Sequence, residues 1–101
     1  MKLVLITAVN QYKDQIKSIL HNAKVPNYSY QDVKGHKDVS NISNQSNWFV
    51  GDRFETNSIL FYAFVKKECT DALFSEIEEF NTNLETLSKI HISVLNIEKT
   101  N

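Results

Sequence analysis

The sequence predicts one α+β domain in which strands and helices follow the order βαββαβ. Three observations support this fold class. Residues 3–9 and 58–65 are apolar at consecutive positions, as in strands that are buried on both faces. Residues 11–23 and 67–81 carry apolar side chains at helical spacing. The chain has 101 residues, which suits one hydrophobic core and is too short for two, so residues 1–101 are interpreted as a single domain.

The first helix is expected directly after the first strand, over about residues 11–23. Asn10 is placed to cap its first amides, and Pro26 is placed to prevent its continuation. The second strand is expected over residues 25–34, because the Tyr and Val residues of this segment favour strands. Gly35 is expected to end that strand.

The second half of the chain supplies a strand, a helix and a final strand. In residues 58–65 the apolar side chains divide between the two faces of a strand, which should therefore be central or covered on both faces. One face carries Ile59, Phe61, Ala63 and Val65, and the other carries Leu60, Tyr62 and Phe64. The helix over residues 67–81 places a stripe of apolar side chains on one face: Cys69, Leu73, Ile77, Phe80 and Leu84. Residues 91–98 are expected to form the last strand.

A long flexible loop is predicted over residues 36–55. Its middle part, residues 38–47, reads DVSNISNQSN, in which nearly every residue favours turns. Both glycines of the chain lie within or beside this polar stretch. We expect the loop to become ordered only when a ligand binds.

The element order βαββαβ is that of the ferredoxin-like sandwich, in which two helices pack on one face of a four-stranded antiparallel sheet. Two helices cover only one face, yet the first and third strands carry large apolar side chains on both. An uncovered second face would leave a larger apolar patch than monomers usually expose. We therefore expect closed cyclic assembly, for which the residue pattern does not choose between a dimer and a trimer.

Composition and motifs argue against several functions. Eleven Lys and Arg against twelve Asp and Glu give a net charge of -1, so nucleic acid is not an expected partner. No apolar run approaches the roughly 20 residues of a membrane span, and no signal peptide is evident, so we expect a cytoplasmic protein that is not integral to a membrane. The single Cys69 is expected to be a small buried hydrophobe. Because phosphate-loop, nucleophile-elbow, HExxH and paired-cysteine motifs are missing, we predict no enzymatic activity.

Four segments carry a resemblance to a known family: KLVLITAV, QYKDQIKSILHNAKVPNYSYQDVKGHK, SILFYAFV and KKECTDALFSEIEEF. With these segments the chain resembles the PII-like signalling proteins, including the nitrogen-regulatory PII group, over nearly its whole length. The resemblance implies a homotrimer with ligand clefts between subunits. It also implies a role in signal transduction, in which a long loop between the second and third strands acts on a partner protein.

The sequence departs from the nucleotide-binding members of that family before the last strand. Those members carry a glycine-containing loop whose backbone amides approach phosphates, whereas this chain reads NTNLETLSKIH. We therefore predict that a standard high-affinity ATP site is missing and that a small anion or an atypical adenine nucleotide binds at the subunit cleft. The CutA-type cation-tolerance proteins have a similar trimeric architecture, so divalent-metal binding is the alternative function.

Five candidate ligand-binding residues lie at the ends of the long loop and before the last strand: Lys34, Gly35, Lys37, Arg53 and Lys89. Lys34 and Lys37 flank the start of the loop and attract anions, and Gly35 lies where the family's loop begins. Arg53 is the only arginine, and its guanidinium can hold a carboxylate, bicarbonate or phosphate through paired hydrogen bonds. The alternatives are solvated lysines and a surface ion pair of Arg53 with a neighbouring acid.

Three further loop residues are candidates for other roles. Trp48 and Phe49 are aromatic side chains in a polar segment, where they can anchor a partner such as a transporter or a metabolic enzyme. Alternatively, they fold over the sheet or the subunit cleft. His36 is the candidate metal ligand, with Asp38 or a residue of another subunit completing the site.

Overall fold

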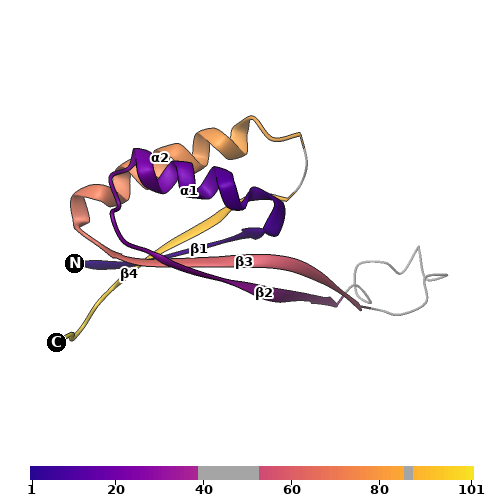
Figure 1. The fold of residues 1–101 in the computed structure, drawn as a ribbon, viewed down its shortest axis with the longest axis horizontal. Coiled ribbons are helices and arrows are strands. Elements are labelled where there is room, and N and C mark those ends of the chain that lie inside the picture. The colour runs from indigo at the N-terminus through magenta and orange to yellow at the C-terminus, as the bar shows by residue number, and fades with distance from the viewer. Residues whose placement is uncertain (39–52, 86–87) are drawn as a thin grey trace.

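The computed structural model describes residues 1–38, 53–85 and 88–101. Within these ranges the chain forms, in order, β1 (Lys2–Val9), the 3₁₀ helix η1 (Asn10–Tyr12), α1 (Lys13–Asn22), β2 (Ser29–Asp38), β3 (Arg53–Val65), α2 (Lys67–Thr82) and β4 (His91–Asn96). Both helices lie on the same face of the sheet (Figure 1). The predicted order βαββαβ is confirmed.

The strands form one antiparallel sheet in the order β2-β3-β1-β4. Val4 of β1 lies opposite Ala63 of β3 on one side and Val94 of β4 on the other. Tyr30 of the edge strand β2 lies opposite Phe61. This topology is the ferredoxin-like fold that the sequence predicts, and β3 is a central strand as expected.

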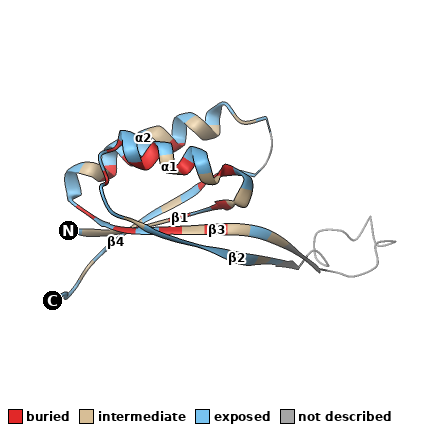
Figure 2. Cartoon of the chain, in the orientation of Figure 1, coloured by how far each residue is buried: buried red, intermediate tan, exposed pale blue. Residues whose placement is uncertain are grey.

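The hydrophobic core fills the space between the sheet and the two helices (Figure 2). Of the two apolar faces predicted for β3, the one with Ile59, Phe61, Ala63 and Val65 is buried against the helices, and Phe61 is only 1% exposed. The helices contribute Ile16, Ile19 and Leu20 from α1 and Leu73 and Ile77 from α2. Of the predicted apolar stripe on α2, Cys69, Phe80 and Leu84 are partly buried against this core. The two helical periodicities therefore identify the core correctly.

The opposite surface of the sheet, here called the open face, has no helix over it (Figure 1). Its apolar side chains gather near the N-terminal end of β1, where Leu3 lies opposite Phe64 and Leu95, and Leu5 lies opposite Tyr62. Phe64 is 55% exposed, Leu95 42% and Tyr62 39%. Toward the other end of β1 the open face becomes mixed, with Thr7 between His91 of β4 and Leu60 of β3. The apolar open face has the location that the sequence predicts.

The paired part of β2 and β3, here called the β2–β3 ribbon, is longer than predicted. β2 begins at Ser29 and continues through Gly35 to Asp38, and β3 begins at Arg53. The expectation that Gly35 ends the strand is therefore wrong. A Cβ atom at Gly35 would lie 2.7 Å from Oγ1 of Thr56 on the opposite strand, so glycine leaves room for that side chain. Residues 36–38 and 53–55, expected in a flexible loop, lie in strands.

The ends of α1 are also set differently from the prediction. Asn10 is not the cap of α1, because it lies in η1 and the N-cap position of α1 is Tyr12. Its Nδ2 donates instead to Oδ1 of Asp32 at 2.9 Å. The helix ends at Asn22, before Pro26. Lys24 takes a left-handed conformation with φ 63°, and the amide of Val25 donates to the carbonyl of Leu20 at 3.0 Å. This arrangement is a Schellman motif, which ends the helix without Pro26.

At the C-terminal end, α2 extends to Thr82, and β4 ends at Asn96 rather than at residue 98. The helices of the described part of the chain are all too short or too polar to cross a membrane.

Candidate functional site

A pocket of about 470 Å³ lies where the β2–β3 ribbon extends beyond the rest of the sheet. We call it the ribbon-base pocket. It is lined by one residue of η1 and by residues of β2 and β3: Asn10, Asp32, Val33, Lys34, Asn57 and Ser58. The strand register places Lys34 opposite Asn57 and Val33 opposite Ser58.

The end of β1 determines where this pocket forms. Val9, the last residue of β1, pairs with Ser58, so the part of β3 before Ser58 pairs with β2 alone. At the same point the chain leaves the sheet through η1 and crosses toward the helix layer, which places Asn10 against Asp32. The two-stranded ribbon and η1 therefore form two sides of the pocket.

The described residues that line the pocket supply one carboxylate and one ammonium group. Asp32 and Lys34 are two residues apart on β2 and so share a face of the strand. Asp32 is oriented by the side-chain amide of Asn10 at 2.9 Å. Within the described part of the chain, Lys34 makes no hydrogen bond or ion pair with its side chain, and it is exposed. Lys34 is thus the predicted ligand residue that the structure places in a pocket.

Gly35 borders this pocket in sequence but lies on the other face of β2, opposite Thr56. The hydroxyl oxygens of Thr56 and Ser58 lie 3.3 Å apart, and both would contact a Cβ atom at Gly35. Packing against these two hydroxyls therefore explains why this position holds glycine. Its ligand role stays a prediction.

Lys89 lies at the corner between α2 and β4, where its Nζ donates to the carbonyl oxygen of Asn81 at 3.0 Å. The side chain of Asn81 in turn donates to the carbonyl of Ile90 and accepts from its amide, both at 2.8 Å. Tyr12 and Phe80, whose ring centroids are 5.3 Å apart, connect η1 to the same end of α2. Lys89 is therefore engaged in fixing this corner and does not line the ribbon-base pocket.

The remaining predicted residues are only partly within the described structure. Lys37 and Arg53 belong to β2 and β3 by their backbones, and nothing is described of their side chains. Trp48 and Phe49 lie outside the described residues. His36 is exposed on β2, opposite Glu55. No group of three or more His, Cys, Asp or Glu side chains gathers among residues 1–38, 53–85 and 88–101, so the metal site also stays a prediction.

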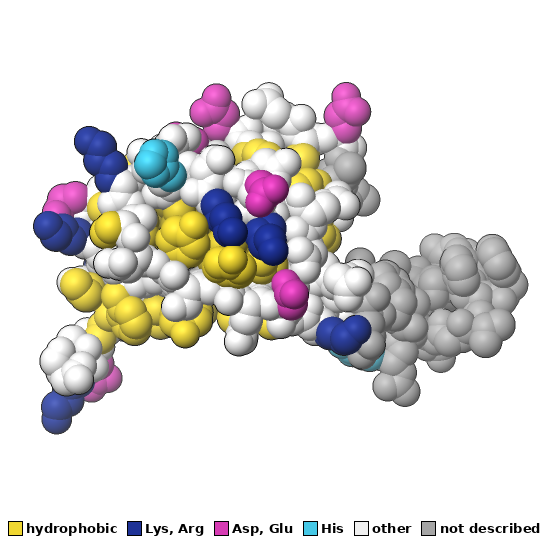
Figure 3. Space-filling model, in the orientation of Figure 1, with side chains coloured by type: hydrophobic (Ala, Val, Ile, Leu, Met, Phe, Trp, Pro, Cys, Tyr) yellow, Lys and Arg dark blue, Asp and Glu magenta, His cyan; other side chains and the backbone are white. Residues whose placement is uncertain are grey.

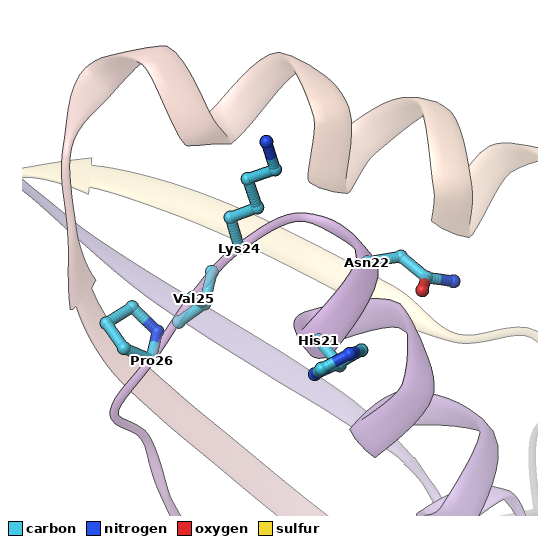
Figure 4. Close-up of a pocket in the computed structure, with 5 residues that line it drawn as sticks. All are labelled: His21, Asn22, Lys24, Val25 and Pro26. Atoms are coloured by element: carbon cyan, nitrogen blue, oxygen red, sulfur yellow. The ribbon is translucent and has the colours of Figure 1, made fainter.

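A second pocket, of about 560 Å³, lies at the C-terminal end of α1 (Figure 4). It is lined by His21, Asn22, Lys24, Val25 and Pro26. Figure 4 shows that the side chains of Asn22, Lys24 and Pro26 point in different directions. A binding site needs polar groups that converge on a ligand, so we place the candidate site at the ribbon-base pocket instead.

An exposed cluster of lysines and tyrosines lies between α1 and β2, and Figure 3 shows Lys side chains over an apolar surface there. Nζ of Lys17 is 4.6 Å and Nζ of Lys13 is 5.6 Å from the ring centroid of Tyr30, which stacks on Phe61 at 5.1 Å. Hydrogen bonding with Lys17 lowers the pKa of the Tyr30 phenol below its ordinary value and raises the pKa of Lys17.

Sequence reasoning missed the other polar residues of the ribbon-base pocket. Asp32 and Ser58 are expected only as parts of strands, Asn57 lies between the predicted loop and the next strand, and Asn10 is expected to cap a helix. One signal was available: Asp32, Lys34 and His36 are polar at alternate positions and so share one face of β2. Such a polar face on a strand under a helix layer indicates that the strand extends beyond the core.

Comparison with known proteins identifies the fold. No protein-family model matches the chain, and no curated protein matches it. Among solved structures, GlnK of B. subtilis superposes with a TM-score of 0.73 at 13% identity, covering 96% of this chain and 84% of GlnK. CPII of Thiomonas intermedia K12, solved with ADP, AMP and acetate bound, superposes with a TM-score of 0.64 at 20% identity, covering 95% of this chain and 84% of CPII. Both are PII proteins, and this chain has the PII-like fold.

Proposed function

We propose that this chain is a PII-like regulatory protein that senses a small ligand at the ribbon-base pocket and controls a partner protein through residues 36–55. The observation that carries the proposal is the position of the pocket. Its walls belong to the two strands from which the loop emerges. A ligand that touches both strands binds more tightly when β2 and β3 are paired than when they are separated. A switch requires such a difference in affinity between two states.

The charge of the pocket supports binding of a small molecule. Within the described residues, the ammonium group of Lys34 has no ion-pair partner, and Lys37 and Arg53 follow in the strands on either side of the loop. CPII was solved with two adenine nucleotides and acetate, all of them anionic. We propose that a small anion or an atypical nucleotide is the ligand class, because the glycine-free segment 84–91 of this chain lacks the backbone geometry of a phosphate cradle.

We propose a homotrimer as the functional form. Leu3, Tyr62, Phe64 and Leu95 leave an apolar patch on the open face that no element of the described chain covers. Closed cyclic symmetry buries such patches against one another. The PII-like fold supports three copies, as the resemblance implies, and a cytoplasmic, non-enzymatic regulator is the role that we assign to this assembly.

Calorimetry tests the proposal directly. The wild-type chain is titrated with ADP, AMP, bicarbonate and acetate, and each titration is repeated with Lys34→Met, which removes the ammonium group but keeps the length of the side chain. We expect at least one ligand to bind the wild type and to bind the variant about tenfold or more weakly, because a charge-assisted hydrogen bond is lost. Equal binding to both proteins would place the site elsewhere.

The partner is tested by pull-down with the same ligands present. We expect a Trp48→Ala and Phe49→Ala double variant to lose the partner that the wild type captures, because aromatic anchors carry much of the binding free energy of an interface. Equal capture by both proteins would contradict the role of these two residues.

A further inference from the structure

Two described residues of the ribbon-base pocket, Asp32 and Lys34, carry opposite charges and form no ion pair with each other. Asp32 and Lys34 lie on the same face of β2, and alternate residues of a strand are about 7 Å apart. Within the described structure no ion pair joins the two side chains, and both are exposed. The pocket therefore presents a carboxylate and an ammonium group that are separated along one strand.

The carboxylate of Asp32 is oriented and still has free acceptor capacity. Asn10 occupies Oδ1 with one hydrogen bond of 2.9 Å. An ionised carboxylate has about four acceptor positions on its two oxygens, so most of them are left for a ligand. The other polar groups of the pocket are the neutral side chains of Asn57 and Ser58. Among the described lining residues, the charged ones are thus one anion and one cation.

This charge pattern discriminates between ligand classes. A nucleotide would bring several negative charges close to Asp32, with one lining lysine to oppose the repulsion. A simple anion would use Lys34 but would partly desolvate Asp32 without a partner, which costs free energy. A ligand with one positive and one negative group satisfies both residues.

We propose that the ribbon-base pocket binds a small zwitterion, a free α-amino acid, with its ammonium group on Asp32 and its carboxylate on Lys34. This proposal rests on the proposed function, because it concerns the same pocket. It keeps the sensing of a small ligand and the anionic group on Lys34, and it adds to that ligand a cationic group held by Asp32. An α-amino acid with one charge-assisted hydrogen bond at each end spans about 8 Å, which the flexible stem of Lys34 can match.

The experiment is a calorimetric panel on the full chain. The probes are the common α-amino acids, each injected separately, together with acetate and ethylamine as ligands that carry only one of the two charges, and ADP as the nucleotide. The variants are Asp32→Asn, which keeps an acceptor for Asn10, and Lys34→Met. The matched control is Lys66→Met, because Lys66 is an exposed lysine at the start of α2, at the other end of the fold (Figure 1).

We expect at least one amino acid to bind the wild type about tenfold or more tightly than acetate or ethylamine, which corresponds to about 1.4 kcal/mol. Each of the two pocket variants should lose about tenfold or more of this affinity, and Lys66→Met should lose none.

Three results would overturn the inference. If ADP or acetate binds, no amino acid does, and Asp32→Asn strengthens the binding, the ligand is an anion, and the proposed function survives without the zwitterion. If an amino acid binds equally to the wild type and Asp32→Asn, the assigned contact is wrong. If no probe binds the wild type, the ribbon-base pocket is not a ligand site, and the proposed function fails as well.

Discussion

The two ends of the β2–β3 ribbon differ in what holds them in place. At the inner end, Tyr30 and Phe61 form a pair that lies under α1, and Phe61 and Ile59 are buried in the core. At the outer end, Lys34 and Asn57 pair beyond the last residue of β1 and are exposed. The inner end is thus stabilised by hydrophobic burial, and the outer end by backbone pairing and by the hydrogen bond between the hydroxyls of Thr56 and Ser58.

This difference indicates where a ligand has the most influence. A ligand in a well-packed core region adds little to a structure that is already fixed, whereas a ligand at the edge of a weakly held ribbon can shift its population of ordered states. The ribbon-base pocket is lined by Lys34 and Asn57 of the outer end. In the proposed function, it couples binding to the part of the molecule from which residues 39–52 emerge.

The largest effect is expected at the inner end, from Phe61→Ala. Phe61 is 1% exposed and contacts the rings of Tyr28 and Tyr30. Its truncation should lower the free energy of unfolding by about 4 kcal/mol, because it leaves a cavity in the core. Urea denaturation measures the change. The matched variant Asn57→Ala at the outer end should change the free energy of unfolding by no more than about 0.5 kcal/mol, and a similar loss from both variants would remove the distinction between the ends.

The apolar part of the open face lies beside the inner end of the ribbon. Phe64→Glu tests the role of this apolar surface in assembly. Phe64 is 55% exposed and lies opposite Leu3. A carboxylate at this position would be buried without a partner at a subunit contact, so the dissociation constant of the trimer should rise by about 100-fold or more. Sedimentation velocity measures it. Phe74→Glu is the control, because Phe74 is 42% exposed on α2, away from the open face. A wild-type chain that sediments as a monomer would contradict the trimer.

A smaller effect is expected at the outer end, from Gly35→Ala. The new Cβ atom would lie 2.7 Å from Oγ1 of Thr56, so the strands must shift or the Thr56 side chain must rotate and lose its contact with Ser58. We expect a loss of about 1 kcal/mol in the free energy of unfolding. The second change Thr56→Ala should recover most of it, because the clashing atom is gone. Urea denaturation of both variants checks this, and no recovery would mean that another strain causes the loss.

The smallest effect concerns the side of α1 that faces the ribbon. Lys17→Met removes the ammonium group beside Tyr30, so the lowered pKa of the Tyr30 phenol should rise toward its ordinary value. Nuclear magnetic resonance of the Tyr30 ring during a pH titration measures the shift. Lys24→Met removes the same charge from a position near the end of α1. It should leave the midpoint of the Tyr30 titration at its wild-type value. If both variants shift it equally, the effect comes from net charge and not from the contact.

The fold could be predicted from the sequence because its signals are local. The apolar patterns of residues 58–65 and 67–81 depend on neighbouring residues of one segment. They identified the two apolar faces of β3 and the core stripe of α2. The ends of elements depend on distant partners. Asn10 has the residue type of a helix cap, but in the structure its side chain donates to Asp32, which is 22 residues away. Gly35 has the residue type that ends a strand, but in the structure the strand continues and Gly35 lies opposite Thr56.

The site was predicted in part for the same reason. Lys34 stands out as a basic residue near the start of a polar segment. The pocket, however, exists because β1 ends opposite Ser58, and this register is a property of the assembled sheet. The alternate polar residues of β2 indicate that this strand extends beyond the core, but they do not indicate the residue of β3 at which its pairing with β1 ends. The neutral and acidic lining residues were therefore missed.

Amide hydrogen exchange tests the central claim, that a ligand at the ribbon-base pocket stabilises the outer end of the ribbon. Exchange is measured on the full chain without ligand, with a mixture of the common α-amino acids, and with ADP. The account predicts slower exchange in peptides covering residues 31–38 and 53–58 with a ligand that calorimetry shows to bind, unchanged exchange in α2, and no protection in Lys34→Met. Binding without protection of these peptides, or equal protection in Lys34→Met, would contradict it.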